Sequence, residues 1–362
     1  MSALPTLKWN KFEIAFWLIP IAAFFLFPRY LTLGSQILIA GLFALSLDLI
    51  LGYARIISLG HAAFFGLGAY TAGLLAKHGF GEPLSGLFAA AAVAALAGWI
   101  TSFLIVRGQD LTRLMVTLGI GLMLFETANQ ASSITGGVDG LSGVEMKKIF
   151  GVFGFGLDGK TAYLYSLAVL FVVFNATRAL VRSPFGLSLK GIREGERRMP
   201  AIGASVRRKL VAVYTIGAGI AGIAGALLAQ TTQFVGIDVF GFQRSAELMI
   251  MLVLGGTGYL YGGLLGAAVF MILQDYLANL NPVYWQFWLG LLLVLLGGIA
   301  ASRVLDVFGA LISSGWSVSK TSRKVVVTSA PAAMKAPFIC ASIACEAGSY
   351  GVTFAPSSAV VD

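Results

Sequence analysis

Long apolar stretches separated by short polar segments form the dominant pattern along this chain. Between Phe12 and Ala301 most stretches hold about 15 to 25 residues with few charges, the length that crosses the hydrocarbon core of a bilayer as a helix. Apolar residues run continuously within each stretch and do not alternate with polar ones, as they would in the strands of a membrane barrel. The pattern predicts an all-α fold, a polytopic transmembrane helical bundle with about 8–10 spans.

A version of this bundle with about ten spans follows from the positions of charged residues, Pro and Gly. Residues 1–11 form a short cytoplasmic start, and residues 12–303 form the membrane domain. The third, eighth and ninth spans are the least regular, and each is equally compatible with a re-entrant segment. The expected spans are 12–27, 31–51, 56–76, 84–106, 114–131, 161–180, 210–230, 246–260, a ninth ending near 277, and 284–301.

Two of these spans place small residues four positions apart, the spacing that brings helix backbones close together. We therefore expect the seventh span, 210–230, to be tightly packed against its neighbours. In the third span, the same glycines alternatively permit a helix that is broken around Ser58–His61. The residues expected to pack these helices or to line a path through the membrane are Ser58, Gly60, His61, Gly66, Gly217, Ala221 and Gly225.

The longest polar segment between apolar stretches, residues 182–209, is strongly basic. It holds eight Lys and Arg residues, opposed by Glu194 and Glu196. A charge at the bilayer centre costs roughly 2.5–3.5 kcal/mol, and Lys and Arg concentrate in cytoplasmic loops. Placing this segment inside puts both chain ends in the cytoplasm. Of the 25 Lys and Arg residues, those left outside are Arg29, Lys77, Lys147, Lys148, Lys160 and Arg244.

Composition narrows the class of protein further. The chain is 58% hydrophobic and only 11% charged, with a mean hydropathy of +0.87, values typical of an integral membrane protein and not of a soluble domain. The cytoplasmic bias of basic residues explains most of the net charge of +9, so we expect no nucleic-acid partner. The sequence has no ATP-binding P-loop and no His-Glu-x-x-His motif, so we expect no catalytic residue, cofactor or metal.

Ionisable residues inside the apolar stretches are few, and each is a candidate for function. Asp48 lies near the end of the second expected span, where contact with water is cheap. Glu247 follows Arg244 by one helical turn, so we expect the two to form an ion pair. His61 either lines a path and titrates near neutrality or is a hydrogen-bonded residue between packed helices, and the sequence leaves both readings open.

Three connections need separate interpretation. The outer loop, residues 132–160, is rich in Gly and is either a gate, a contact for an external donor protein, or a plain connection; its candidate residues are Thr135, Gly136, Gly137 and Gly140. Residues Ile192–Ser205 of the inner segment mix both charge signs with short apolar residues. They suit a short surface helix held against another protein, or an ordinary basic loop. The tail, residues 304–362, is expected to be poorly ordered, and its abrupt change of composition suggests a frameshift.

Four sequence blocks, taken in order, resemble the LivM/LivH-type permeases and stand nearer to LivM. The blocks are LGYARIISLGHAAFFGLGAYTAG, TGGVDGLSG, GIREGERRMPAIGASVRRKLVAVYTIGAGIAGIAGAL and LVLGGTGYLYGGLLGAA. None of them is specific alone, but four in the family's order are, and the resemblance covers residues 31–301. It implies a multi-pass permease subunit of an ABC importer for branched-chain amino acids, or related amino acids and amides, in the bacterial inner membrane.

The resemblance also implies partners. These are a homologous second permease (LivH-like), two cytoplasmic ABC ATPase subunits that bind the ATP, a periplasmic substrate-binding protein and the lipid bilayer. The family's coupling loop maps onto Arg193–Gly203, although Met199-Pro200 departs from its pattern. Pro fits the first turn of a helix and not its interior, so the start of the coupling helix is expected to shift. The coupling residues are expected to be Arg193, Glu194, Gly195, Glu196, Ala201 and Gly203.

A self-sufficient secondary transporter of small polar solutes is the alternative function. Such a protein needs ionisable pairs near the middle of the membrane and two halves related as inverted repeats. Charged residues are scarce in the middle of the expected spans, and no repeat of convincing length occurs in the chain. The sequence therefore favours the importer subunit.

Overall fold

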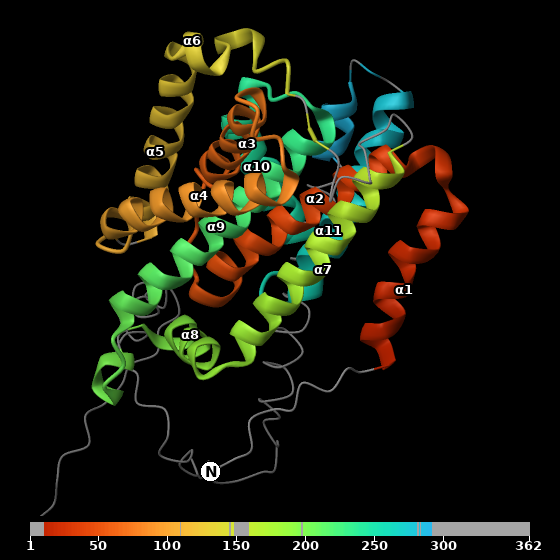
Figure 1. Ribbon diagram of the computed structural model, residues 1–362. Helices are drawn as coiled ribbons and strands as arrows, with labels where there is room; N and C mark the ends of the chain where they lie inside the picture. Colours follow the sequence, from red (N-terminus) through yellow and green to blue (C-terminus); the bar gives the residue numbers. More distant parts are fainter. Residues whose placement is uncertain are drawn as a thin grey trace, which may run out of the picture. The chain divides into compact units, whose positions relative to one another are not determined.

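The computed structural model describes residues 11–108, 110–144, 146–147, 159–196, 198–280, 282 and 284–291, which all belong to one compact unit. The tail 304–362, the frameshift hypothesis and most of the tenth expected span lie outside the described residues. So does the later part of the outer loop. Within the described part the chain is a helical bundle, as predicted (Figure 1).

The helices follow the apolar stretches closely, and short 3-10 or π segments join several of them. The α-helices are α1 (Lys11–Leu26), α2 (Leu31–Leu47), α3 (Ala62–Lys77), α4 (Pro83–Ile105), α5 (Asp110–Gln130), α6 (Ser132–Thr135), α7 (Lys160–Arg182), α8 (Pro184–Gly195), α9 (Val206–Thr232), α10 (Phe242–Gly255) and α11 (Leu260–Leu280). The short segments are η1 (Pro28–Tyr30), η2 (Asp48–Gly52), η3 (Gly137–Asp139), η4 (Met199–Ile202) and η5 (Ile237–Phe240).

Six helices of the described part are long and apolar enough to cross a bilayer: Pro28–Gly52, Pro83–Ile105, Leu111–Gln130, Lys160–Arg182, Val206–Thr232 and Leu260–Leu280. These six make the chain a multi-pass membrane protein, and the full count of about 8–10 spans stays a prediction. Helices α3 and α10 are shorter, with 16 and 14 residues. At 1.5 Å per residue they are about 24 and 21 Å long, shorter than the hydrocarbon core of about 30 Å.

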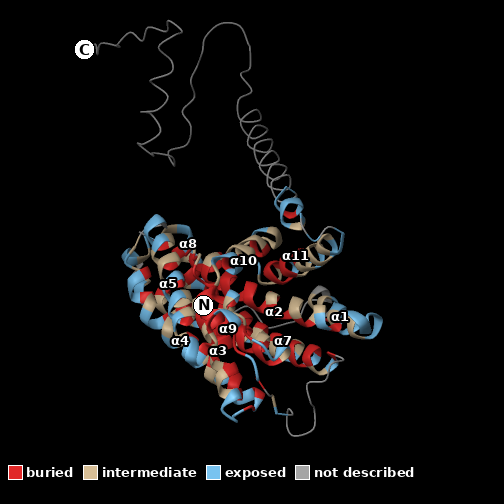
Figure 2. Cartoon of the chain, turned by 90° about the horizontal axis from the view of Figure 1, so that it is seen from above, coloured by how far each residue is buried: buried red, intermediate tan, exposed pale blue. Residues whose placement is uncertain are grey.

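Helix α9 forms the centre of the bundle, as its small-residue face predicts. Figure 2 shows buried residues gathered where α2, α3 and α9 meet. A side chain at Gly217 would collide with Ile50 of η2, and one at Gly225 would collide with the backbone carbonyl of Phe65 in α3. The hydrophobic effect contributes little between helices in lipid. Close contact of the helix backbones supplies the packing energy instead.

The third expected span is broken, and the continuous helix expected over residues 56–76 is wrong for its first turn and a half. After η2, Arg55 adopts a left-handed φ of +55°, and helical structure resumes only at Ala62. The alternative of a break around Ser58–His61 is confirmed. The break is held by other elements, because the backbone N–H of Leu59 donates to Oγ1 of Thr117 on α5.

The inner segment contains a surface helix, but at a different place from the one expected over Ile192–Ser205. Helix α8 spans Pro184–Gly195, and the expected range beyond it holds only the single turn η4. Ser183 caps α8 by accepting a bond from the N–H of Gly186, and Pro184 occupies the first turn, where Pro is favoured. Gly203 then stops η4 with a φ of +81°. Local capping residues, and not the charge pattern, therefore set the position of the helix.

Candidate functional site

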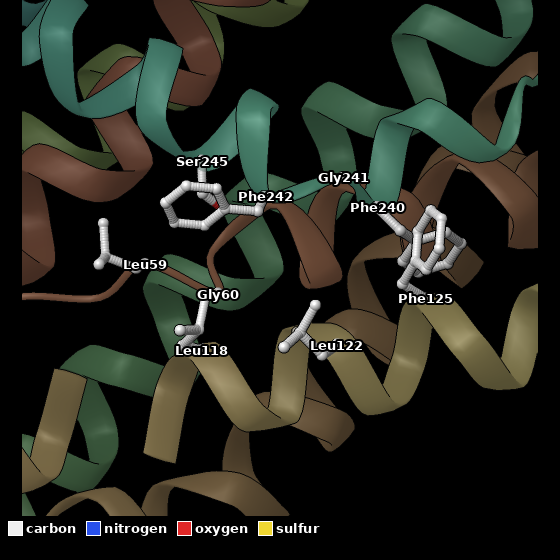
Figure 3. Close-up of a pocket in the computed structure, with 10 residues that line it drawn as sticks. Leu59, Gly60, Leu118, Leu122, Phe125, Phe240, Gly241, Phe242 and Ser245 are labelled. Atoms are coloured by element: carbon white, nitrogen blue, oxygen red, sulfur yellow. The ribbon is translucent and has the colours of Figure 1, made fainter. Parts of the chain in front are cut away.

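The broken segment, α5 and the start of α10 enclose an apolar pocket of about 190 Å³. Figure 3 shows the side chains of these three segments turned toward a common space. No charged side chain lines this pocket. The lining residues are Leu59, Gly60, Leu118, Gly121, Leu122, Phe125, Phe240, Gly241, Phe242 and Ser245.

Two glycines place the broken segment directly against α5. A side chain at Gly60 would meet the backbone carbonyl carbon of Thr117 at 2.8 Å, and one at Gly121 would meet the Cα of Gly60 at 3.2 Å. Only glycine allows this approach, since contacts below about 3 Å between carbon atoms are strongly repulsive. The approach leaves Leu118, Leu122 and Phe125 on the neighbouring face of α5, where they form one wall of the pocket.

Both short helices, α3 and α10, begin next to this pocket. The backbone N–H of Ala62, the first residue of α3, donates a 3.0 Å hydrogen bond to Oγ of Ser245 in the first turn of α10. The N-terminus of a helix carries a partial positive charge. Broken helices whose N-termini meet inside a membrane protein are a recurrent arrangement at transport sites. The pocket thus combines apolar walls with two electropositive helix ends.

His61 lies next to the pocket but does not line it. Its side chain is fully buried, its Nε2 atom lies 2.8 Å from Oγ of Ser46, and its ring stacks on Phe43 with a centroid distance of 5.6 Å. Ser58 is also fully buried. The geometry favours the reading of His61 as a hydrogen-bonded packing residue between α2 and α3.

The other expected path residues divide between the pocket and the core. Gly60 lines the pocket, and Gly66 lies against the ring of Phe240, which lines it as well. Gly217, Ala221 and Gly225 lie on α9 in the core of the bundle and pack helices, the other role expected of them.

Sequence reasoning missed the residues of α5 and the segment from Phe240 to Ser245. The only signal for that segment is a glycine flanked by two phenylalanines, Phe240-Gly241-Phe242. That pattern is too short to be specific without the fold.

The expected ion pair on α10 is confirmed. Nη1 of Arg244 lies 3.4 Å from Oε2 of Glu247, and Nη2 of Arg244 lies 3.3 Å from Oδ2 of Asp238. Arg244 and Glu247 border a second pocket of about 140 Å³, which is lined by residues of α2, α3, α9, α10 and α11. Their exposure makes the pair a modest contributor to stability.

The described part of the outer loop is a series of tight turns fastened to the bundle. Gly136, Gly137 and Gly140 have φ values of +81°, +60° and +74°, conformations that glycine adopts without strain. Oγ1 of Thr135 donates to the carbonyl of Ala128 at 2.6 Å. Leu141 then pairs with Val235 through two backbone hydrogen bonds of 2.8 and 3.2 Å. The candidate residues of this loop therefore shape a connection that reaches the segment leading to the pocket.

The expected coupling residues lie on the surface of the inner segment. Arg193, Glu194 and Gly195 end α8, and Ala201 and Gly203 belong to η4 and its stop. The side chains of Arg193 and Glu194 are exposed.

Glu196 connects this surface to the pocket wall. Its Oε1 atom lies 3.1 Å from Nη2 of Arg113 at the start of α5. The inner segment is thus joined to the helix that carries Leu118, Leu122 and Phe125.

Known proteins resemble the chain over most of its length. Residues 29–297 match the family described as the permease component of branched-chain amino acid transport systems. The high-affinity branched-chain amino acid permease protein LivM of Escherichia coli (strain K12) is 30% identical over 80% of this chain and 73% of its own length. The autoinducer 2 import permease LsrC of Enterobacter sp. (strain 638) is also 30% identical, over 74% and 79%. No solved structure matches significantly.

The matched range includes the six long apolar helices, the first of them without Pro28, together with the broken segment and the pocket. It also includes α8 and η4, so the family's shared length contains both the apolar site and the surface formed by α8 and η4. These relatives are transport components and not enzymes. The chain belongs to the family of permease components of branched-chain amino acid transport systems.

Proposed function

We propose that this chain is a permease subunit of an ABC importer that passes branched-chain amino acids across the bacterial inner membrane. The observation that supports the substrate class is the apolar pocket at the broken segment. Burying an aliphatic side chain there gains about 0.8 kcal/mol per CH₂ group, whereas a polar side chain would lose its hydration without finding a partner. The helix ends at Ala62 and Phe242 suit the carboxylate of an amino acid.

The energy for transport comes from partners in this proposal. Two cytoplasmic ATPase subunits bind the ATP and dock on the inner surface formed by α8 and η4, which exposes Arg193 and Glu194. A homologous second permease completes the path, and a periplasmic binding protein delivers the substrate. The exposed apolar side chains of α4 and α5, such as Phe88 and Met123, suit contact with lipid or with that second permease.

Movement of the docking surface would switch the path between two packings. ATP-driven closure of the ATPases displaces α8 and η4, and the helices around α9 shift between outward-open and inward-open arrangements. A partner biases such an equilibrium only through contacts that differ between the two states. The exposed end of α8 is where such contacts would form.

Uptake competition tests the substrate. Cells that lack the gene and carry it on a plasmid should take up radiolabelled leucine, and excess isoleucine or valine should compete. Excess urea or a charged amino acid should compete far less, because the pocket offers no polar side chain except Ser245. Because one relative is named for autoinducer 2 import, that compound belongs among the competitors. Competition by urea or autoinducer 2, but not by valine, would overturn the substrate assignment.

Reconstitution separates the importer from the secondary transporter. Vesicles containing this chain alone should not accumulate leucine under an ion gradient. Vesicles that also contain the ATPases and the second permease should do so when supplied with ATP and the binding protein. Accumulation by the chain alone would reject the importer reading.

A further inference from the structure

A buried carboxylate joins three segments at the inner end of the bundle. Asp48, the first residue of η2, is fully buried. Its Oδ1 atom accepts a 2.7 Å hydrogen bond from the backbone N–H of Gly258, in the turn between α10 and α11. Its Oδ2 atom has no hydrogen-bond partner among the described residues. A buried carboxylate with a free oxygen is costly in an apolar setting, so its presence at this junction points to a role beyond packing.

Helix α8 approaches this carboxylate with two basic residues on one face. A side chain at Gly258 would collide with Nη1 of Arg193, so the guanidinium lies beside the residue whose backbone N–H binds Asp48. One helical turn earlier, Nζ of Lys190 lies 5.9 Å from the ring centre of Tyr53, directly after η2. The surface helix thus lies beside both the turn and the end of η2.

The segments that meet at Asp48 are the ones that lead to the pocket. From Gly52, η2 continues directly into the broken segment with Leu59 and Gly60, which form one wall. From the turn at Gly258, α10 runs back over 14 residues, about 21 Å, to Ser245 and Phe242 at the opposite wall. Asp48 therefore links the start of η2 to the turn that follows α10. The far ends of these two stretches, the broken segment and the start of α10, face each other across the pocket.

The α10 side of this junction is rigid. A side chain at Gly266 of α11 would collide with the carbonyl of Met251 and would meet the N–H nitrogen of Gly255 at 2.7 Å. Backbones in such close contact move together and not past each other. A displacement of the turn is thus a displacement of the whole α10–α11 hairpin.

We propose that Asp48 is a positioning residue for transport, which passes a displacement of α8 through Arg193 and Gly258 to the two segments that wall the pocket. In one state Oδ1 holds the turn, as observed; in the other, the free Oδ2 receives the guanidinium of Arg193. The inference rests on the proposed docking of ATPases at α8. Asp48 is then the internal residue that transmits the docking of the ATPases to the substrate path.

The test uses the complete transporter in vesicles, with ATP hydrolysis and radiolabelled leucine uptake measured on the same sample. Asp48→Asn keeps an oxygen for the N–H of Gly258 and removes the charge that attracts Arg193. We expect assembly and ATP hydrolysis to persist, and leucine uptake per ATP to fall about fivefold or more. Arg193→Gln should do the same, and the double variant should be no worse than the worse single one. Arg208→Gln, an equal loss of charge on the exposed start of α9, should keep the normal ratio.

A pair of glycine variants supplies an independent arm. Gly256 and Gly258 have φ values of +89° and +85°, so alanine is equally strained at either position. Only at Gly258 would the new side chain strike Arg193, whereas Gly256 has only a distant contact, 4.0 Å, with Tyr259. Gly258→Ala should lower uptake per ATP, and Gly256→Ala should not.

The outcomes separate this inference from the proposed function. Unchanged uptake per ATP in Asp48→Asn overturns the inference, and if that variant fails to assemble, an unchanged ratio in Arg193→Gln overturns it. Loss of ATPase binding in Arg193→Gln with a normal ratio in Asp48→Asn also overturns it, because Arg193 would then act only in docking. Failure of the unaltered complex to couple ATP to leucine uptake would instead reject the proposed function.

Discussion

The backbone N–H of Gly258 donates a hydrogen bond to the carboxylate of Asp48, although the two residues stand 210 positions apart in the chain. Gly52 lies in the same junction, and a side chain there would meet the Cα of Gly258 at 2.9 Å. The segment η2 and the α10–α11 turn therefore fit together without room for a methyl group.

Substitution of Gly52 tests this fit. Gly52→Ala should lower the free energy of unfolding by about 1–3 kcal/mol, because overpacking forces backbone shifts. Gly119→Ala on α5 is the control, since nothing lies within 4 Å of the added carbon. Thermal unfolding in detergent would measure both. Equal midpoints for the two variants would contradict the observed junction.

The packing of α9 gives a second matched pair. Gly225→Ala would press a methyl group on the backbone of Phe65 and Ala69, whereas Gly219→Ala meets Ala95 at an ordinary 3.4 Å. We expect the first variant to lose about 1–3 kcal/mol and the second to be neutral or slightly stabilising, because Ala favours helix more than Gly does. Denaturation of the purified permease in detergent provides the measurement, and a reversed order would be inconsistent with the packing described.

A buried ion cluster anchors α1 to α7. Glu13, with a side chain 14% exposed, contacts Arg178, which is 2% exposed, and Oε1 of Glu13 lies 3.5 Å from Arg182. Glu13→Gln should destabilise the protein by about 3–5 kcal/mol, since it removes the negative charge that faces the buried guanidinium of Arg178. Asp238→Asn, which breaks an exposed pair with Arg244, should cost about 1 kcal/mol or less. Thermal unfolding midpoints of the Glu13→Gln and Asp238→Asn variants in detergent would measure the two effects. Similar shifts of the midpoint would contradict the buried ion cluster.

The pocket makes a prediction about substrate size. Leu122→Trp fills space that Leu122 and Leu118 now line, so leucine uptake should fall about tenfold while alanine uptake falls less, as expected for a site that loses volume. Met123→Trp on the same helix changes a side chain that is 71% exposed and lines no part of the pocket. Initial rates of leucine and alanine uptake would measure the effect of each variant. Equal losses of leucine uptake in the two variants would show that the pocket does not hold the transported substrate.

The docking surface makes a prediction about energy supply. Glu194→Arg and Gly203→Val should abolish uptake and leave membrane insertion intact, because both positions are exposed and Gly203 ends η4 with a left-handed φ. Co-purification of the ATPases with each variant would show whether docking is lost. Glu82→Gln, an exposed change next to the start of α4, is the control. Normal uptake in the Glu194 and Gly203 variants would contradict a coupling role.

Part of the candidate site was readable from sequence because its signal is local. The small residues of α9 predicted its tight packing, Gly60 was recognised within the broken segment, and the Arg244–Glu247 pair follows from helical spacing. The position of α8 was missed, although Ser183-Pro184 is a local signal for a helix start. The charge pattern around Arg193–Gly203 does not mark the helix, because capping residues and not charges set its start.

The sequence by itself determined that this protein is a helical membrane protein and which stretches are apolar enough to cross, because the cost of placing a residue in hydrocarbon adds up along one segment. The tertiary structure alone decided which segments meet. Leu59 with Thr117, Ala62 with Ser245 and Asp48 with Gly258 each join distant parts of the chain. Such contacts depend on backbone approach between helices, and the residues of a single segment do not specify their partner.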